Sequence, residues 1–122
     1  MLVVDDKEDN REFLAQLLNP AGFDIRQAVN GEDALKQFKA WLPQLILMDL
    51  RMPVMDGYEA IRRIRTGAGG KKVKIIAVTA SIFGEINSEA LGAGADALIL
   101  KPFREAELFE KMRILLGAEY VY

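Results

Sequence analysis

Four apolar runs of the chain each end in polar residues whose side chains could do chemistry. These residues are Asp5 and Asp6, Asp49, Thr79, and Lys101. If the runs are neighbouring parallel strands, the polar residues meet at the carboxyl edge of one sheet, where open α/β folds bind ligands. Three carboxylates brought that close repel one another, and such a group either takes up protons or recruits a cation. Carboxylate oxygens with room for water suit Mg²⁺ better than zinc or copper.

Beside a divalent ion, Asp49 could act as a nucleophile towards phosphorus. The metal and the Lys101 ammonium would neutralise the oxygens of the transferring group, and the Thr79 hydroxyl would donate to one of them. This set of residues predicts phosphoryl transfer to a carboxylate. The chain contains no histidine, and this chemistry needs none within it.

The elements that must position these residues alternate along the chain. Five strands are predicted at residues 1–4, 23–29, 45–49, 74–78 and 97–100, and the third, with four apolar residues in a row, is typical of a strand buried on both faces. Helical spacing of apolar residues predicts helices over about residues 9–18, 30–41, 58–65, 83–91 and 105–116. Asp9 or Asn10 is expected to cap the first helix. We therefore predict a doubly wound, flavodoxin-like α/β fold with a five-stranded parallel sheet in the order 2-1-3-4-5.

Length and composition restrict the classes of function. With 122 residues the chain is predicted to form one domain over residues 1–122. The absence of cysteine and histidine excludes disulfides, thiolate or imidazole metal sites and His-based triads. A net charge of −2 argues against a nucleic-acid surface, and no apolar run approaches the ~20 residues of a membrane helix. We expect a cytoplasmic domain without membrane or nucleic-acid contact of its own, although a parent protein could be membrane-anchored.

The motifs in this order resemble the receiver domain of response regulators in two-component signalling. The resemblance rests on residues 3–6, 48–53, 55–57, 79–80, 94–96 and 101–103 and covers nearly the whole chain. It implies that Asp49 is the phosphoacceptor and that Asp5, Asp6, Asp49 and the main-chain carbonyl of Arg51 hold Mg²⁺. It also implies that Thr79 and Lys101 contact the phosphoryl group, and that a cis peptide before Pro102 turns Lys101 towards the site.

Three further segments are similar to receivers attached to hybrid sensor histidine kinases. They are residues 10–11, 52–59 and 79–83. The implied phosphodonor is a histidine kinase or a histidine phosphotransfer domain, and a homodimer is possible. By this resemblance the domain catalyses its own phosphorylation and dephosphorylation without being an independent enzyme, although its parent chain could be a kinase. A stand-alone response regulator is the alternative context.

The chain departs from the usual receiver pattern at two positions. Receivers usually carry Tyr or Phe three residues before the lysine, where this chain has Leu98. A switch built from Thr79 and Leu98 therefore lacks the usual ring. Arg51, two residues after the acceptor, is long and cationic, so it could shield the phosphoryl group or point into water.

Each chemical interpretation has alternatives. Asp5 and Asp6 could have no role beyond capping the first helix, and Asp49 could have no role beyond starting a turn. Thr79 could be a structural hydroxyl, and Lys101 could be a solvated charge. An aspartyl-phosphate phosphatase of the haloacid-dehalogenase type would want an acid in place of Arg51, and a flavodoxin-type binding module would want a Ser/Thr-rich phosphate loop after the first strand. The glycine-rich segment 67–72 leaves a helix and enters a strand, the reverse of a P-loop, so it is predicted to be a flexible connector. The arginines at positions 62, 63 and 65 are predicted to form a solvated helix face.

Overall fold

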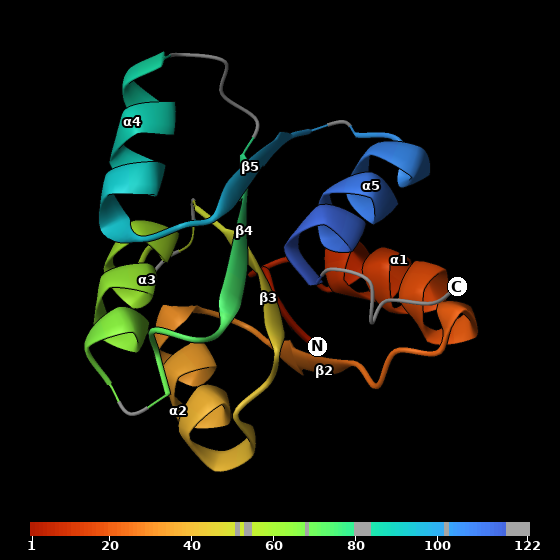
Figure 1. Cartoon of the computed structure of the whole chain (residues 1–122). Coiled ribbons are helices and arrows are strands. Elements are labelled where there is room, and N and C mark those ends of the chain that lie inside the picture. The colour runs from red at the N-terminus through yellow and green to blue at the C-terminus, as the bar shows by residue number, and fades with distance from the viewer. Residues whose placement is uncertain (51, 53–54, 68, 80–83, 102, 117–122) are drawn as a thin grey trace.

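The computed structural model shows one parallel sheet with helices on both faces (Figure 1). The strands are β1 (Leu2–Val4), β2 (Arg26–Ala28), β3 (Leu45–Asp49), β4 (Lys74–Thr79) and β5 (Ala97–Leu100), in the order β2-β1-β3-β4-β5. The helices are α1 (Glu8–Leu18), α2 (Gly31–Trp41), α3 (Gly57–Thr66), α4 (Gly84–Ala93) and α5 (Glu105–Leu116), and a 3₁₀ turn, Asn19–Ala21, follows α1. The structure describes residues 1–50, 52, 55–67, 69–79, 84–101 and 103–116, without the side chains of 84–88. The predicted fold class and strand order are confirmed.

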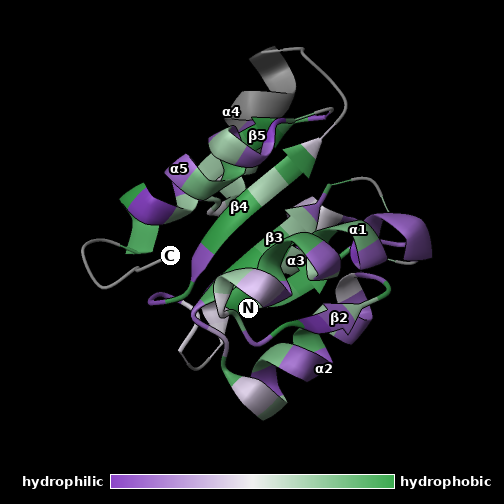
Figure 2. Cartoon of the chain, turned by 90° about the vertical axis from the view of Figure 1, so that its right-hand side faces the viewer, coloured by the Kyte–Doolittle hydropathy of each residue, from purple (hydrophilic) through white to green (hydrophobic). Residues whose placement is uncertain are grey.

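The sheet separates two apolar clusters. All five residues of β3 are buried, and the packed apolar residues of β1, β3, β4 and β5 belong alternately to the two clusters, as period-two geometry requires. Helices α2, α3 and α4 cover one face, and α1 and α5 cover the other (Figure 1). Figure 2 shows β3 and most of β4 as hydrophobic, whereas the helices also carry hydrophilic residues. No helix in the described part of the chain is long and apolar enough to cross a membrane.

Side-chain caps start two of the helices that flank the site. The Asn30 side chain accepts a hydrogen bond from the Asp33 N–H at 2.8 Å at the start of α2, and Asp56 accepts one from the Glu59 N–H at 2.9 Å at the start of α3. The predicted cap of α1 is wrong. Helix α1 starts after Lys7 without a side-chain cap, and both Asp9 and Asn10 lie within its first turn, beyond the N-cap position.

The second strand is shorter than predicted. It comprises only Arg26–Ala28, which pair with the three residues of β1, whereas the preceding residues Phe23 and Ile25 pack against the cluster under α1 and α5. The Arg26 guanidinium lies 4.5 Å from the centre of the Trp41 ring, a cation–π contact that joins this edge strand to α2. Strand β2 is therefore held by side-chain contacts as well as by its pairing with β1.

The prediction that three arginines form a solvated face of α3 is right for two of them and wrong for Arg65. Arg62 and Arg63 are exposed and pair with Glu59, and the hydrogen bond from Arg63 lowers the pKa of Glu59. The Arg65 side chain is only 18% exposed and forms an ion pair with Asp96, with an N–O distance of 2.8 Å. Its guanidinium also donates to three main-chain carbonyls, those of Gly70, Val73 and Gly94, at 2.6–2.8 Å. Arg65 thus ties α3 to the connector before β4 and to the turn before β5.

Candidate functional site

Three carboxylates meet where β1 and β3 end. Asp49 is the last residue of β3, and Asp5 directly follows β1, its N–H donating to the Ala28 carbonyl of β2 at 3.1 Å. One carboxylate oxygen from each of Asp5, Asp6 and Asp49 lies within 4.8 Å of the others. Asp5 and Asp49 are buried, whereas Asp6 is exposed. The cluster therefore has a buried base and an open side towards solvent.

Asp5 is held in place by its neighbours. The Lys7 N–H donates to one carboxylate oxygen at 2.9 Å, and the Asn10 side-chain amide donates to the other at 3.1 Å. Arg11 donates to the Asp5 carbonyl at 2.9 Å and to the Gln27 side chain at 3.1 Å. From the sequence, Asn10 was predicted as a possible helix cap, and Asn10 and Arg11 together as features of hybrid-kinase receivers, but neither was predicted to support Asp5. Their position in the helical turn after the first acidic pair was the signal that they could support that pair.

Lys101 brings a positive charge to the carboxylates from the end of β5. Its Nζ lies 3.3 Å from an Asp5 oxygen and 3.9 Å from an Asp49 oxygen. Its main-chain N–H donates to the Thr79 carbonyl at 2.7 Å, so the residue is fixed to β4. Pro102, predicted to turn this lysine by a cis peptide, lies outside the described residues.

Thr79 ends β4 beside the acids. It is buried, and it directly follows Val78, the residue that pairs with Asp49 across the sheet. Leu98, the position where an aromatic ring was expected, pairs with Ala77 and is partly buried against the cluster on the α2, α3 and α4 face. The two predicted switch residues thus lie on neighbouring strands.

The loop after Asp49 returns tightly over the end of β3. The Gly57 N–H donates to the Leu50 carbonyl at 3.1 Å, and the Leu50 N–H donates to the Val78 carbonyl at 3.1 Å. A Cβ on Gly57 would lie 2.7 Å from the Leu50 Cα and closer still to the Asp49 carbonyl oxygen, so only glycine fits there. Arg51, predicted to offer its carbonyl to the metal, lies outside the described residues.

A cavity of about 490 Å³ adjoins the carboxylates between α1 and the end of β5. Its polar end is formed by Asp5, Asn10, Asp49 and Lys101. Its remaining walls are apolar and include the exposed Phe13 on α1. Two of the three carboxylates, those of Asp5 and Asp49, therefore line the charged end of a cavity whose other walls are apolar.

The donor set of the site suits a hard divalent cation. Three carboxylate oxygens converge, the described part of the chain brings neither thiolate nor imidazole to them, and the exposed side at Asp6 leaves room for water. Mg²⁺ is commonly held in this way, by a few carboxylates with several waters retained. The single ammonium of Lys101 offsets only part of the negative charge, so a cation there is electrostatically favoured.

Comparison with known proteins assigns the family. The model of the response regulator receiver domain matches residues 1–113. The chain belongs to the response regulator receiver family. Among curated receiver relatives, it is 37% identical over 116 residues to the probable transcriptional regulator ycf27 of Porphyridium aerugineum, and this match covers 95% of the chain but 47% of the relative. It is 36% identical over 118 residues to protein CcdB of Bacillus subtilis, covering 96% of the chain and 97% of the relative.

Solved receiver structures agree with the fold described above. A putative response regulator from Chloroflexus aurantiacus superposes with a TM-score of 0.89 at 33% identity, covering 94% of each chain. The receiver domain of sensor histidine kinase PA1611 from Pseudomonas aeruginosa superposes with a TM-score of 0.88 at 33% identity, covering 96% of each chain. The PA1611 receiver was crystallised with a magnesium ion coordinated in its active site cleft. A putative response regulator and the receiver domain of a sensor histidine kinase are thus both among the structural relatives.

Proposed function

We propose that this receiver accepts a phosphoryl group on Asp49 from a phosphohistidine donor, with Mg²⁺ held by Asp5, Asp6, Asp49 and the Arg51 carbonyl. The proposal rests on the convergence of three carboxylates, whose oxygens lie within 4.8 Å of one another, with the Lys101 ammonium 3.9 Å from an Asp49 oxygen. A nucleophilic carboxylate, a cation site and a fixed positive charge are what transfer to a carboxylate requires. The magnesium coordinated by the PA1611 receiver supports the assignment of the metal.

In the proposed reaction an Asp49 carboxylate oxygen attacks phosphorus, and the bond between phosphorus and the donor's imidazole nitrogen breaks. The nitrogen keeps the bonding electron pair, and the product is an aspartyl phosphate. Bound Mg²⁺ supplies charge neutralisation for the phosphoryl oxygens. Lys101 neutralises the charge on a further phosphoryl oxygen, and the Thr79 hydroxyl donates a hydrogen bond to another. Asn10 and Lys7 donate hydrogen bonds that keep the Asp5 carboxylate oriented.

We further propose that the phosphodonor is a histidine kinase or a histidine phosphotransfer domain, and that the parent protein is a hybrid sensor histidine kinase. Support comes from the residues shared with such receivers and from the likeness to the PA1611 receiver. The residues at 80–83 and 53–54 that contribute to this likeness lie outside the described part of the chain. A stand-alone response regulator is the second context, favoured by the CcdB match along its full length. Either context places the domain in the cytoplasm.

Incubation with acetyl phosphate and Mg²⁺ tests the proposal against a phosphatase. A receiver should gain one phosphoryl group per chain, seen by intact mass, and should then turn over slowly. A phosphatase would release inorganic phosphate continuously without accumulating the intermediate. Continuous release at a constant rate, with no phosphorylated chain accumulating, would overturn the proposal that this receiver holds the phosphoryl group on Asp49.

Magnesium is expected to stabilise the wild type against unfolding more than it stabilises Asp6→Ala. A ligand that binds only the folded state stabilises it by RT ln(1 + [L]/Kd), so ~10 mM Mg²⁺ at a millimolar site gives roughly 1 to 1.5 kcal/mol. Asp6 is the exposed member of the cluster, and its removal should lower affinity with little cost to packing. Thermal melts of both proteins with Mg²⁺ and with EDTA measure the difference. An equal gain in the two proteins would contradict the ligand role of Asp6.

The missing ring at Leu98 is expected to weaken transmission of the phosphorylated state. An aromatic ring at this position can be either buried or exposed, and the two positions differ clearly in free energy. A leucine side chain is shorter, so the free-energy difference between its two packings is smaller. With beryllofluoride as the phosphoryl mimic, amide shifts should be large beside Asp49 and Thr79 and modest at Leu98 and along α5.

Hydrogen exchange along the chain, with and without beryllofluoride, checks this expectation. The variant Leu98→Tyr is the matched comparison and should increase the change on α4, β5 and α5. Changes in the wild type at Leu98 and α5 as large as those beside Asp49 would show that leucine suffices as the switch.

A further inference from the structure

A second cavity lies at the opposite edge of the sheet, where the strands begin. Its volume is about 540 Å³, within the range of roughly 300–1,000 Å³ that is usual for small-molecule sites. It is lined by residues immediately before β3, at the start of β4 and at the end of α5. Because β4 spans about 16 Å from Lys74 to Thr79, this amino-edge cavity is separate from the carboxylate cluster.

The walls of the amino-edge cavity combine large apolar side chains with polar groups. Phe38 and Val73 form buried parts of it, and Leu42 stands at its margin with 58% of its surface exposed. Leu42 has a left-handed backbone conformation, with φ of +50°, which is rare for a leucine. The remaining large apolar wall residues are Phe23, Leu115 and Leu116. Such a lining favours a ligand with an apolar body.

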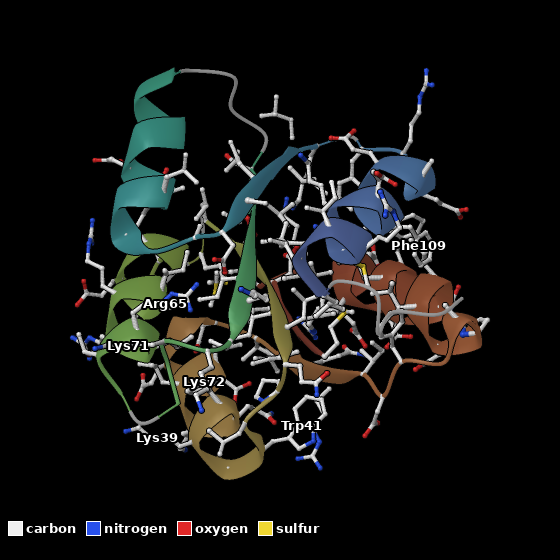
Figure 3. All side chains as sticks on the ribbon, viewed as in Figure 1. Lys39, Trp41, Arg65, Lys71, Lys72 and Phe109 are labelled. Carbon is white, nitrogen blue, oxygen red and sulfur yellow. The ribbon has the colours of Figure 1, made fainter. Side chains whose placement is uncertain are left out.

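Two lysines give the amino-edge cavity a positive charge. Lys72 and Lys74 both line it, and no carboxylate of the described residues forms an ion pair with either ammonium. Figure 3 shows Lys72 on the connector just before β4, on the side of the molecule where α2 ends. The chain as a whole carries a net charge of −2, so these cations are a local feature of this edge. They complement an anion.

The connector that carries Lys72 is held in place before any ligand arrives. Arg65, labelled in Figure 3, donates to the carbonyls of Gly70 and Val73, which lie before and after Lys72 in the chain. Gly69 has φ of +78°, and a Cβ there would lie 3.4 Å from a Leu42 methyl carbon, so the connector lies close to the leucine. A preorganised cavity loses less entropy when it binds a ligand.

We propose that the amino-edge cavity binds a small amphiphilic carboxylate, with its apolar body against Phe38, Leu42 and Val73 and its carboxylate beside Lys72 and Lys74. The described lining residues include no arginine, whose planar fork is well suited to phosphate oxygens. Lysine ammonium groups act as point charges, which suit a single anionic head group. This site would give the receiver a second ligand input independent of Asp49.

Octanoate is the probe for this proposal, followed by amide NMR of the unphosphorylated chain without Mg²⁺. We expect saturable shifts at Leu42, Gly69, Lys72 and Lys74 with octanoate, and much smaller ones with acetate or with octylamine at equal concentration. Fluorescence of Trp41, the single tryptophan of the chain and the residue before Leu42, gives a second readout.

Charge reversal separates a specific site from general apolar adsorption. Lys72→Glu should weaken octanoate binding by about 5- to 10-fold, since an attraction becomes a repulsion at a partly screened surface. Lys36→Glu, an exposed lysine of α2 outside the cavity, changes the net charge equally and should leave the affinity unchanged. Equal shifts with octylamine, equal weakening by both variants, or no saturable shift would overturn the proposal. None of these outcomes depends on phosphorylation of Asp49.

Discussion

Asp49→Asn is expected to abolish phosphoryl incorporation while leaving the domain folded. The amide has nearly the same shape as the carboxylate but lacks the nucleophilic oxygen charge. Incubation with acetyl phosphate and Mg²⁺ followed by intact mass should show one phosphoryl group on the wild type and none on the variant. Stoichiometric incorporation at the site by Asp49→Asn would show that another residue is the acceptor.

The same substitution is expected to raise the free energy of unfolding in the absence of Mg²⁺. Asp49 lies within 4.8 Å of two other carboxylates and 3.9 Å from one ammonium, so its removal relieves two repulsions and loses one attraction. One such pair is worth on the order of 3 kcal/mol at an effective dielectric constant near 20, before screening. After screening we expect a gain of about 1 to 2 kcal/mol in urea unfolding with EDTA present. Asp56→Asn and Asp33→Asn are poor controls because both carboxylates accept main-chain hydrogen bonds at helix starts, whereas Asp24→Asn changes the same charge at an exposed position outside the cluster.

Arg65→Met is expected to produce the second large effect, a loss of about 2 to 4 kcal/mol in the free energy of unfolding. Methionine keeps the packing of the aliphatic stem but removes every donor. The carbonyls of Gly70, Val73 and Gly94 would lose the hydrogen bonds that Arg65 gives them, and Asp96 would lose its cationic partner. Urea unfolding of the variant and the wild type under the same conditions measures the loss.

Arg62→Met is the matched control for Arg65. It makes the same substitution on the same helix, where the side chain is half exposed and meets Glu59 across 3.5 Å. Exposed pairs of this kind contribute at most about 1 kcal/mol, so the control should change stability little. Equal losses in the two variants would contradict the structural role assigned to Arg65.

Periodicity and strand-end chemistry sufficed to predict the fold. Buried strands such as β3 are short apolar runs with an abrupt polar end, so their position and the side chains that follow them could be located without coordinates. Gly57 and the cap residue Asn30 could be assigned to turns and helix starts for the same reason, because local backbone geometry dictates the residue type.

Contacts between segments far apart in sequence could not be predicted. The partners of Arg65 lie 5 to 31 residues away. Helical spacing puts Arg65 four residues after the buried Ile61, on the inner side of α3, so the error was to group it with Arg62 and Arg63 by charge. The hydrogen bond from the Asn10 side-chain amide to the buried Asp5 carboxylate likewise depends on how the turn between β1 and α1 folds, which residue type alone does not reveal. The predicted second strand was too long because Phe23 and Ile25, which precede β2, pack against the apolar cluster from a loop and do not pair with β1.

Chemical location of the phosphoryl group tests the central claim most directly. The receiver is phosphorylated with acetyl phosphate and Mg²⁺, the acyl phosphate is reduced with borohydride to homoserine, and the modified residue is identified by peptide mass spectrometry. We predict homoserine at position 49 alone, with no signal when EDTA replaces Mg²⁺. Homoserine at position 5, 6 or 56, or at position 49 to an equal extent without a divalent ion, would contradict the assignment of Asp49 as the metal-assisted phosphoacceptor.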